Sequence, residues 1–272
     1  MPPPLSGAPP DARPDPLLGP ELSHLRARIA RWERTGARAW GAAPFGDARV
    51  DGRLAGGGLA RGAWHEIGGA GLERECPAAA AGFAAAVARQ CAGDGAIIWA
   101  LRRDDAHAPG LAGLGLDPDR VIFLRAASDD DVLAIMEDAL RTRGVGAAIG
   151  EAGAVSLTAG KRLHLACEHG GASAFVLRRA LYTAPRAQAA SAATTRWVVA
   201  SAPSDAREPY LGPPRWRVTL ERSRGGRPGA WIMEAEDEAS KTPSNFGGRA
   251  LRVVAELADH RMAAPDPVAA AG

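Results

Sequence analysis

A glycine-rich turn between an apolar run and an alanine-rich stretch has the layout of a phosphate-binding loop. The run is Trp64–Ile67, and the stretch Pro77–Gln90 is predicted to form a helix. Nucleotide-hydrolysing loops place Lys-Ser or Lys-Thr directly after such glycines, because the lysine contacts the phosphates and the hydroxyl binds Mg²⁺. This turn has neither pair, and its carboxylates would repel a triphosphate. We interpret it as a degenerate nucleotide loop, with the residues Gly68, Gly69, Gly71, Glu73 and Arg74.

The remaining reactive side chains form no second catalytic pattern. His164 and His169 are five residues apart, whereas two zinc ligands on one helix face are four apart. Glu168 stands beside His169, and we expect the two to form a surface pair. The three cysteines contain no C-x-x-C pair and are expected to be buried, inert thiols: Cys76, Cys91 and Cys167. The sequence therefore predicts no metal site and no cofactor.

The composition is that of an ordinary globular protein. The 272 residues are 46% hydrophobic and 24% charged, and no apolar run approaches the roughly 20 residues that span a bilayer. The first residues, Met1-Pro2-Pro3-Pro4, lack the charged start and apolar core of a signal peptide. We therefore expect a cytoplasmic protein that does not enter a membrane.

Positive charge is concentrated in one region. Between Lys161 and Ala230, twelve basic residues stand against four acidic ones. Such a region can bind nucleic acid or an acidic protein, and the alternative is a solvated face. Nearly all of the basic residues are arginines, which a GC-rich genome explains better than selection for arginine chemistry.

The middle of the chain alternates apolar strands with helices of βαβ spacing. The strand predictions after the first are Ala96–Leu101, Arg120–Arg125, Val145–Ile149 and Ala172–Leu177. The helix predictions after Pro77–Gln90 are Pro109–Leu116, Asp129–Arg141 and Thr158–His169. Near-continuous apolar strands separated by helices are typical of a parallel sheet covered on both faces. The fold class is therefore α/β, with a mostly parallel twisted sheet.

The last third changes to antiparallel strands. Thr195–Ser201 alternates as a strand, and Trp216–Arg222 and Ala230–Glu236 flank a glycine-rich hairpin loop. Residues 239–248 are predicted to be a loop. Ala250–Arg261 is predicted to be a helix, because Leu251, Val254 and Leu257 recur at helical spacing. A flexible tail follows.

The N-terminal region is predicted to lie outside the core. Residues 1–20 contain eight prolines and are expected to be disordered. Glu21–Thr35 is predicted to be a helix with one apolar stripe, formed by Leu22, Leu25, Ile29 and Trp32. The stripe either packs on its own domain or acts as a detachable arm that docks on a partner. The predicted organisation is a tail (1–20), a helix and linker (21–44), a core (45–238) and a C-terminal loop, helix and tail (239–272).

Val50–Gly69 resembles the lead-in to the phosphate-binding loop of RecA-type recombinases. There a short helix, a GGGL-x-x-G turn and an EI-x-G strand follow one another. The hairpin Trp216–Glu236 resembles a late hairpin of the same core, so the likeness covers roughly residues 45–236. A more specific resemblance is to the ImuA family, RecA-like proteins of bacterial mutagenesis cassettes, with the cell-division inhibitor SulA as a shorter relative. It rests on motifs at Leu25–Glu33, Pro44–Asp51, Gly56–Gly69, Leu101–Asp104 and Thr195–Trp197.

RecA-type hydrolysis requires four parts, and the resemblance implies where each would lie. The loop lacks its Lys-Thr, as described above. Arg102-Arg103 stands where the catalytic glutamate would be, and Arg178-Arg179 replaces the γ-phosphate sensor. One acid remains, Glu151, at the position of the Walker B carboxylate. With three of four parts missing, we expect no ATPase activity, and weak nucleotide binding without turnover is the alternative.

Six arginines are candidates for contact with DNA or a protein partner: Arg178, Arg179, Arg215, Arg217, Arg222 and Arg224. The first two follow a strand of the parallel sheet, at the rim where α/β folds bind ligands. Two aromatic residues, Tyr182 and Trp197, are close to them in sequence. Trp197 is either part of the same surface or a core residue of its strand.

The resemblance to the ImuA family implies a non-catalytic accessory protein of the SOS response to DNA damage. Its implied partners in error-prone translesion synthesis are an ImuB-like Y-family polymerase subunit and an error-prone C-family polymerase, with RecA as a further candidate. Contact with DNA is expected through these partners rather than directly. The alternatives are a SulA-like inhibitor of cell division and a weak RecA-like protein that binds nucleotide or DNA.

Overall fold

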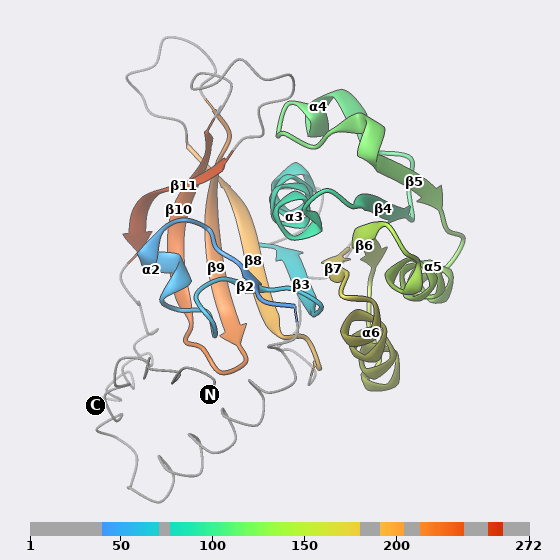
Figure 1. Ribbon diagram of the computed structural model, residues 1–272. Coiled ribbons are helices and arrows are strands. Elements are labelled where there is room, and N and C mark those ends of the chain that lie inside the picture. The colour runs from blue at the N-terminus through green and yellow to red at the C-terminus, as the bar shows by residue number, and fades with distance from the viewer. Residues whose placement is uncertain (1–39, 71–76, 180–190, 204–212, 237–249, 258–272) are drawn as a thin grey trace, which may run out of the picture.

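A single large sheet organises the protein in its computed structural model (Figure 1). The described residues are 40–70, 77–179, 191–203, 213–236 and 250–257. The sheet has nine strands in the order β11-β10-β9-β8-β3-β7-β6-β4-β5. Two short strands, β1 (Ala42–Ala43) and β2 (Leu59–Ala60), pair separately.

The strands from β8 to β5 run parallel to one another, and the other three are antiparallel. The parallel strands are β3 (Trp64–Gly69), β4 (Ala96–Leu101), β5 (Val121–Arg125), β6 (Val145–Ala152), β7 (Ser173–Arg178) and β8 (Thr195–Ala202). The antiparallel strands are β9 (Arg215–Ser223), β10 (Gly229–Glu236) and β11 (Ala250–Leu257). The mostly parallel α/β sheet with an antiparallel end is therefore confirmed.

Helices cover both faces of the parallel half. Helix α3 (Pro77–Ala92) packs on one face, and α5 (Asp129–Arg141) and α6 (Leu157–Gly170) pack on the other (Figure 1). The shorter helices are α2 (Ala48–Asp51), α4 (Ala108–Ala112) and the 3₁₀ turn η1 (Pro118–Arg120). The predicted helix positions agree with these bounds to within a few residues. Helix α5 begins at Asp129, as predicted, because Ser128 and Asp131 form a capping box there.

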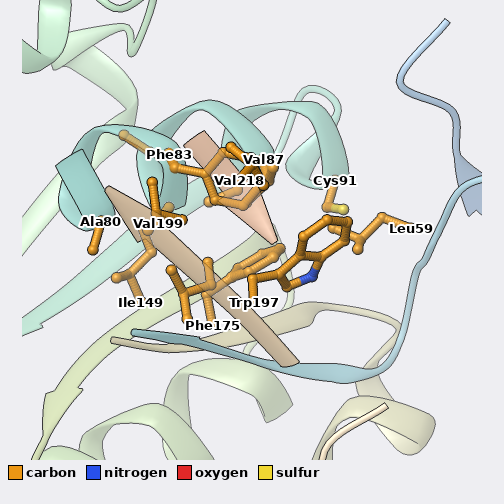
Figure 2. Packing of buried hydrophobic residues seen from close by; sticks show 14 of the residues in the cluster. Leu59, Ala80, Phe83, Val87, Cys91, Ile149, Phe175, Trp197, Val199 and Val218 are labelled. Carbon is orange, nitrogen blue, oxygen red and sulfur yellow. The ribbon is translucent and has the colours of Figure 1, made fainter. Parts of the chain in front are cut away.

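The larger core lies between α3 and the sheet and is rich in aromatic residues (Figure 2). Trp197 is 1% exposed, and its ring lies 5.6 Å from that of Phe83 and 6.4 Å from that of Trp231. Its indole nitrogen donates a hydrogen bond to Thr195 Oγ1 over 2.7 Å. Trp197 is therefore a core residue, and its proposed alternative role on a binding surface is excluded.

The predicted helix at Ala250–Arg261 is wrong, because residues 250–257 form strand β11 at one end of the sheet. Val253 is 5% exposed and packs in the core, whereas Val254 is 37% exposed. The strand has period-two alternation, with a bulge at Val254 opposite the step from Ile232 to Met233. Leu251, Val254 and Leu257 also satisfy helical spacing, which is why the pattern suggested a helix. The sheet thus extends past residue 238, the predicted end of the core.

The predictions for residues 1–39, for the loop 239–248 and for the tail after residue 257 lie outside the described residues. They include the stripe formed by Leu22, Leu25, Ile29 and Trp32. The end of the predicted linker is described: Trp40 donates a hydrogen bond to the Glu168 carbonyl over 3.0 Å, and Ala43 is fully buried. The folded part therefore begins several residues before position 45.

Candidate functional site

The described part of the degenerate loop is the end of β3. Gly68 is paired with Arg178 of β7 on one side and with Val198 of β8 on the other. Beyond Gly69, the Ala70 amide donates to the Val199 carbonyl over 2.9 Å, so β3 keeps its contact with β8 to the start of the loop. The other loop residues, Gly71, Glu73 and Arg74, lie outside the described residues.

The carboxyl edge of the parallel strands gathers the positions that a nucleotide site would use. Because parallel strands end at the same edge, the segments after β4, β6 and β7 meet there. The Arg102 amide donates to Glu151 Oε2 over 3.1 Å, and the Arg179 guanidinium donates to Glu151 Oε1 over 3.0 Å. The sequence-predicted acid and two of the replacement arginine positions are therefore in direct contact.

Glu151 is held by residues of its own chain. It is 1% exposed, and both of its carboxylate oxygens accept hydrogen bonds from Arg102 or Arg179. Burial raises the pKa of the Glu151 carboxyl, while Arg179 and the Arg102 amide oppose the increase. Arg179 also pairs with Asp105 over 2.7 Å. Arg179 thus occupies the space beside the acid where a bound cation would balance its charge.

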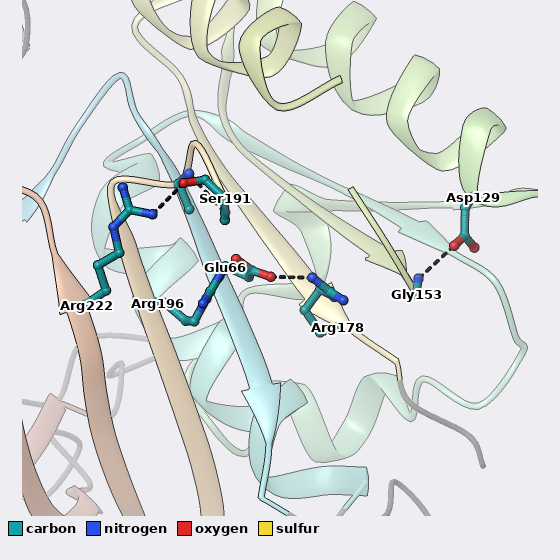
Figure 3. A network of polar contacts seen from close by, with 8 residues as sticks. Glu66, Asp129, Gly153, Arg178, Ser191, Arg196 and Arg222 are labelled. Atoms are coloured by element: carbon teal, nitrogen blue, oxygen red, sulfur yellow. Dashed lines mark hydrogen bonds and ion pairs between the residues drawn. The ribbon is translucent and has the colours of Figure 1, made fainter. Parts of the chain in front are cut away.

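Further ion pairs neutralise the same edge. Arg125 at the end of β5 lies 2.5 Å from Asp104, and Arg102 lies 3.7 Å from Asp129. The other Asp129 oxygen accepts a hydrogen bond from the Gly153 amide over 2.8 Å (Figure 3). Among the described residues, no group of three or more His, Cys, Asp or Glu side chains could hold a metal ion. The described part of the edge is therefore lined by arginine–carboxylate contacts.

A second cluster lies in the middle of the sheet, around Glu66 of β3. Arg178 on β7 and Arg196 on β8 bind the two oxygens of this carboxylate from opposite sides, Arg196 over 3.1 Å (Figure 3). Glu66 is 3% exposed. The contact joins the three central strands through their side chains, in addition to their backbone ladder.

The same arrangement recurs in the antiparallel half of the sheet. Glu234 of β10 binds Arg215 of β9 and Arg252 of β11, the latter over 2.7 Å. Glu234 is 5% exposed. One buried glutamate flanked by an arginine on each neighbouring strand is therefore a repeated feature of this sheet.

Five of the six arginines predicted to contact DNA or a partner bind groups of their own chain. Besides the pairs described above, Arg222 donates to the Ser191 carbonyl (Figure 3), and Arg224 donates to the Ala192 carbonyl over 3.3 Å. Arg217 is exposed, and no hydrogen bond or ion pair joins its guanidinium to another described residue. The predicted basic surface is thus largely a set of internal contacts, with Arg217 as the exception.

The acidic partners Glu66, Asp105 and Glu234 were not identified from the sequence. For Glu66 a signal was available, because a charged residue within an apolar strand requires an opposite charge when it is buried. For Glu234 the signal was similar, because its position in a strand of alternating pattern places it on the buried face and therefore requires an opposite charge. No local signal could show that Asp105 meets Arg179, which is 74 residues away.

The remaining reactive residues have structural roles. Cys91 and Cys167 are buried, as predicted, and burial raises the pKa of both thiols to about 12, while Cys76 lies outside the described residues. Glu168 pairs with His164 over 3.4 Å, one helical turn away, rather than with its neighbour His169. No helix among the described residues is long and apolar enough to cross a membrane.

Comparison with known proteins identifies relatives of this chain. No family model matches the sequence. Protein ImuA from Caulobacter vibrioides (strain NA1000 / CB15N) is 48% identical over 231 residues, which cover 82% of this chain and 92% of the relative. Protein ImuA from strain ATCC 19089 / CIP 103742 / CB 15 gives the same values. The crystal structure of SulA from Pseudomonas aeruginosa aligns with a TM-score of 0.37 and 20% identity, over 43% of this chain and 98% of that chain.

An identity of this level over most of both chains reflects common descent. It agrees with the order of the sequence motifs described above, four of which lie wholly or largely in the folded part. The chain belongs to the ImuA family.

Proposed function

We propose that this protein is a non-catalytic, RecA-like accessory factor of the DNA-damage response that supports error-prone translesion synthesis in the cytoplasm. Membership of the ImuA family supports the process. The strand order β8-β3-β7-β6-β4 supports a RecA-like core, because it brings the loop, the second-strand arginines, the retained acid and the replaced sensor to one edge.

The observation that carries the non-catalytic role is the contact between Arg179 and Glu151. A Walker B acid acts by holding Mg²⁺ and its water shell, so its oxygens must be available to the metal. Here the carboxylate is buried and its oxygens accept hydrogen bonds from Arg102 and Arg179. Opening this contact would remove the cation that balances the charge of the buried Glu151 carboxylate, which costs several kcal/mol.

An ATP-binding and phosphate-release assay on the purified full-length chain tests this role. We expect phosphate release no faster than in a protein-free blank, because the chain lacks the loop lysine and hydroxyl. The variants Glu151→Ala and Arg103→Ala should give the same baseline. Turnover well above the blank that either variant abolishes would contradict the proposal.

The proposed partners are an ImuB-like Y-family polymerase subunit and an error-prone C-family polymerase, with RecA as a third candidate. The proposed docking element is the apolar stripe formed by Leu22, Leu25, Ile29 and Trp32. Contact with DNA is proposed to occur through these partners, because most of the candidate arginines bind residues of their own chain. Arg217 is the described candidate for a direct contact.

A pull-down with each purified partner tests the docking element. Replacing Leu25 and Ile29 together with aspartate should abolish capture of at least one partner without lowering the melting temperature, because the stripe is proposed to dock on a partner rather than to pack on its own domain. The matched control replaces Leu17 and Leu18, in the proline-rich segment, with aspartate. Unchanged capture of every partner by the Leu25/Ile29 variant would exclude the stripe as a docking element.

A further inference from the structure

Strand β5 is an apolar strand at the open edge of the sheet. It is the outermost strand, paired only with β4 among the described residues, and lies between α4 and α5 at the periphery of the molecule (Figure 1). Three consecutive apolar side chains are exposed on it: Ile122 at 51%, Phe123 at 36% and Leu124 at 39%. Soluble proteins normally protect such an edge with lysine, proline, a bulge or a covering element, because it can pair with another strand. Residues 121–124 contain no lysine, proline or bulge, and no other strand of the described part of the chain pairs with their open side.

The backbone direction at this edge follows from the ladder with β4. The Ala126 amide donates to the Leu101 carbonyl over 2.8 Å, so residue 126 points toward β4. Backbone groups alternate in direction along a strand, so Phe123 presents both its N–H and its C=O to the open side. Val121 and Arg125 do the same. The exposed edge is thus a row of hydrogen-bonding groups flanked by apolar side chains.

We propose that two copies of this chain associate through β5, in antiparallel pairing about a two-fold axis at Phe123. In this register Phe123 lies opposite the partner's Phe123, and the two residues exchange both backbone hydrogen bonds. Ile122 lies opposite the partner's Leu124, so the most exposed side chain of each strand meets an apolar one. The two sheets continue into one another, and the open edge is removed from both copies.

The charges at the ends of β5 favour the antiparallel arrangement. Asp117 and Asp119 precede the strand, and Arg125 ends it. Antiparallel pairing brings the partner's Arg125 to the end of the strand that the aspartates precede, whereas parallel pairing would align like charges. Arg120 also lies at that end, but its guanidinium is held at the Gly93 and Gly95 carbonyls of its own chain, and Arg125 pairs with Asp104 while remaining exposed. The strand is therefore complementary to a second copy of itself in hydrogen bonding and in its apolar side chains, and the end charges favour the antiparallel direction.

Cysteine crosslinking of the full-length chain tests the register. Across a hydrogen-bonded antiparallel pair the Cα atoms are about 5.5 Å apart, which is within disulfide range. Phe123→Cys in a Cys76→Ser background should therefore form a disulfide-linked dimer on mild oxidation. The matched control is Leu165→Cys in the same background, because Leu165 is 62% exposed but lies on α6. Crosslinking of Phe123→Cys that does not exceed the control would overturn the register.

Light scattering after gel filtration tests the association itself. The wild-type chain should have twice the monomer mass of 28.1 kDa, with dissociation on dilution. Ile122→Lys should be monomeric at the same concentration, because it places an ammonium against the partner's Leu124. Leu157→Lys, at a site on α6 that is 53% exposed, should remain dimeric. A wild-type monomer, a dimer that Ile122→Lys leaves intact, or an open-ended series of larger species would each overturn the proposal. These outcomes are independent of the proposed role in translesion synthesis.

Discussion

Three buried glutamates show how individual side chains stabilise this sheet. Glu66, Glu151 and Glu234 are each nearly buried, and each is matched by arginines from other segments of the chain. A buried carboxylate is tolerated only when an opposite charge and hydrogen bonds compensate its lost hydration. The arginines that suggested a binding surface in the sequence are, in most cases, this compensation. Residue type alone could not distinguish the two roles, because the acidic partners are distant in sequence.

His65 is the buried titratable residue with the clearest consequence for stability. Its ring is fully buried, lies 2.7 Å from Thr195 Oγ1 and 2.9 Å from the Ala60 carbonyl, and stacks on Phe175. Burial lowers the pKa of His65 from 6.5 to about 4. Below a pH of about 6.5 the unfolded chain therefore binds a proton that the folded chain does not bind. The free energy of unfolding should fall by about 3 kcal/mol from this residue as the pH falls from about 6.5 to about 4.

Urea unfolding at a series of pH values measures this contribution. His65→Gln should be less stable than the wild type at neutral pH, and the difference should shrink or reverse toward pH 4 because the variant lacks the titrating group. His107→Gln is the matched control, since His107 is exposed at the N-cap of α4. Parallel stability curves for the wild type and His65→Gln would show that His65 is not the buried neutral group described here.

At the scale of elements, local signals predicted the parallel strands and the antiparallel strands β9 and β10 well, and failed at the last strand, β11. The capping box at Ser128 and the left-handed Gly171 give α5 and α6 ends that can be recognised in the sequence. Strand β11 has no helix-capping signal of this kind, and its apolar residues fit both a helical and a strand spacing. Pairing with β10 makes residues 250–257 a strand rather than a helix. A local sequence pattern carries no information about this tertiary contact.

The two valines of β11 give a direct test of the strand assignment. Val253→Asp should lower the free energy of unfolding by about 3 kcal/mol, because it places a carboxylate in the core without a partner. Val254→Asp should change it by less than about 1 kcal/mol, because Val254 is partly exposed at the bulge. A helix with Leu251, Val254 and Leu257 on its buried side would give the reverse order. Thermal and urea unfolding of both variants would distinguish the two.

At the scale of the whole molecule, ion pairs join the segments that meet at the carboxyl edge of the sheet. The fold class, most helix and strand positions and the place of Glu151 at the end of its strand were predictable, because they depend on periodicity and on the order of motifs along the chain. The contacts at the edge were not, because they join residues that only the strand order β7-β6-β4 brings together. Arg179 forms ion pairs with both Glu151 and Asp105 there. A nucleotide would have to displace these contacts before it could bind.

Thermal unfolding with and without ATP and Mg²⁺ tests whether these contacts keep a nucleotide from binding at the carboxyl edge. A ligand that binds the folded state at about 100 times its dissociation constant stabilises it by about 2.7 kcal/mol, which shifts the melting temperature by several degrees. We expect no shift here at millimolar nucleotide, because the loop lacks its lysine and Arg179 holds the acid. Arg179→Ala should melt at a lower temperature, since it leaves Glu151 buried without its cation, and it should still not respond to nucleotide. A nucleotide-dependent rise in the wild type would show that the edge opens to a ligand, and a rise confined to Arg179→Ala would identify Arg179 as the residue that keeps the site closed.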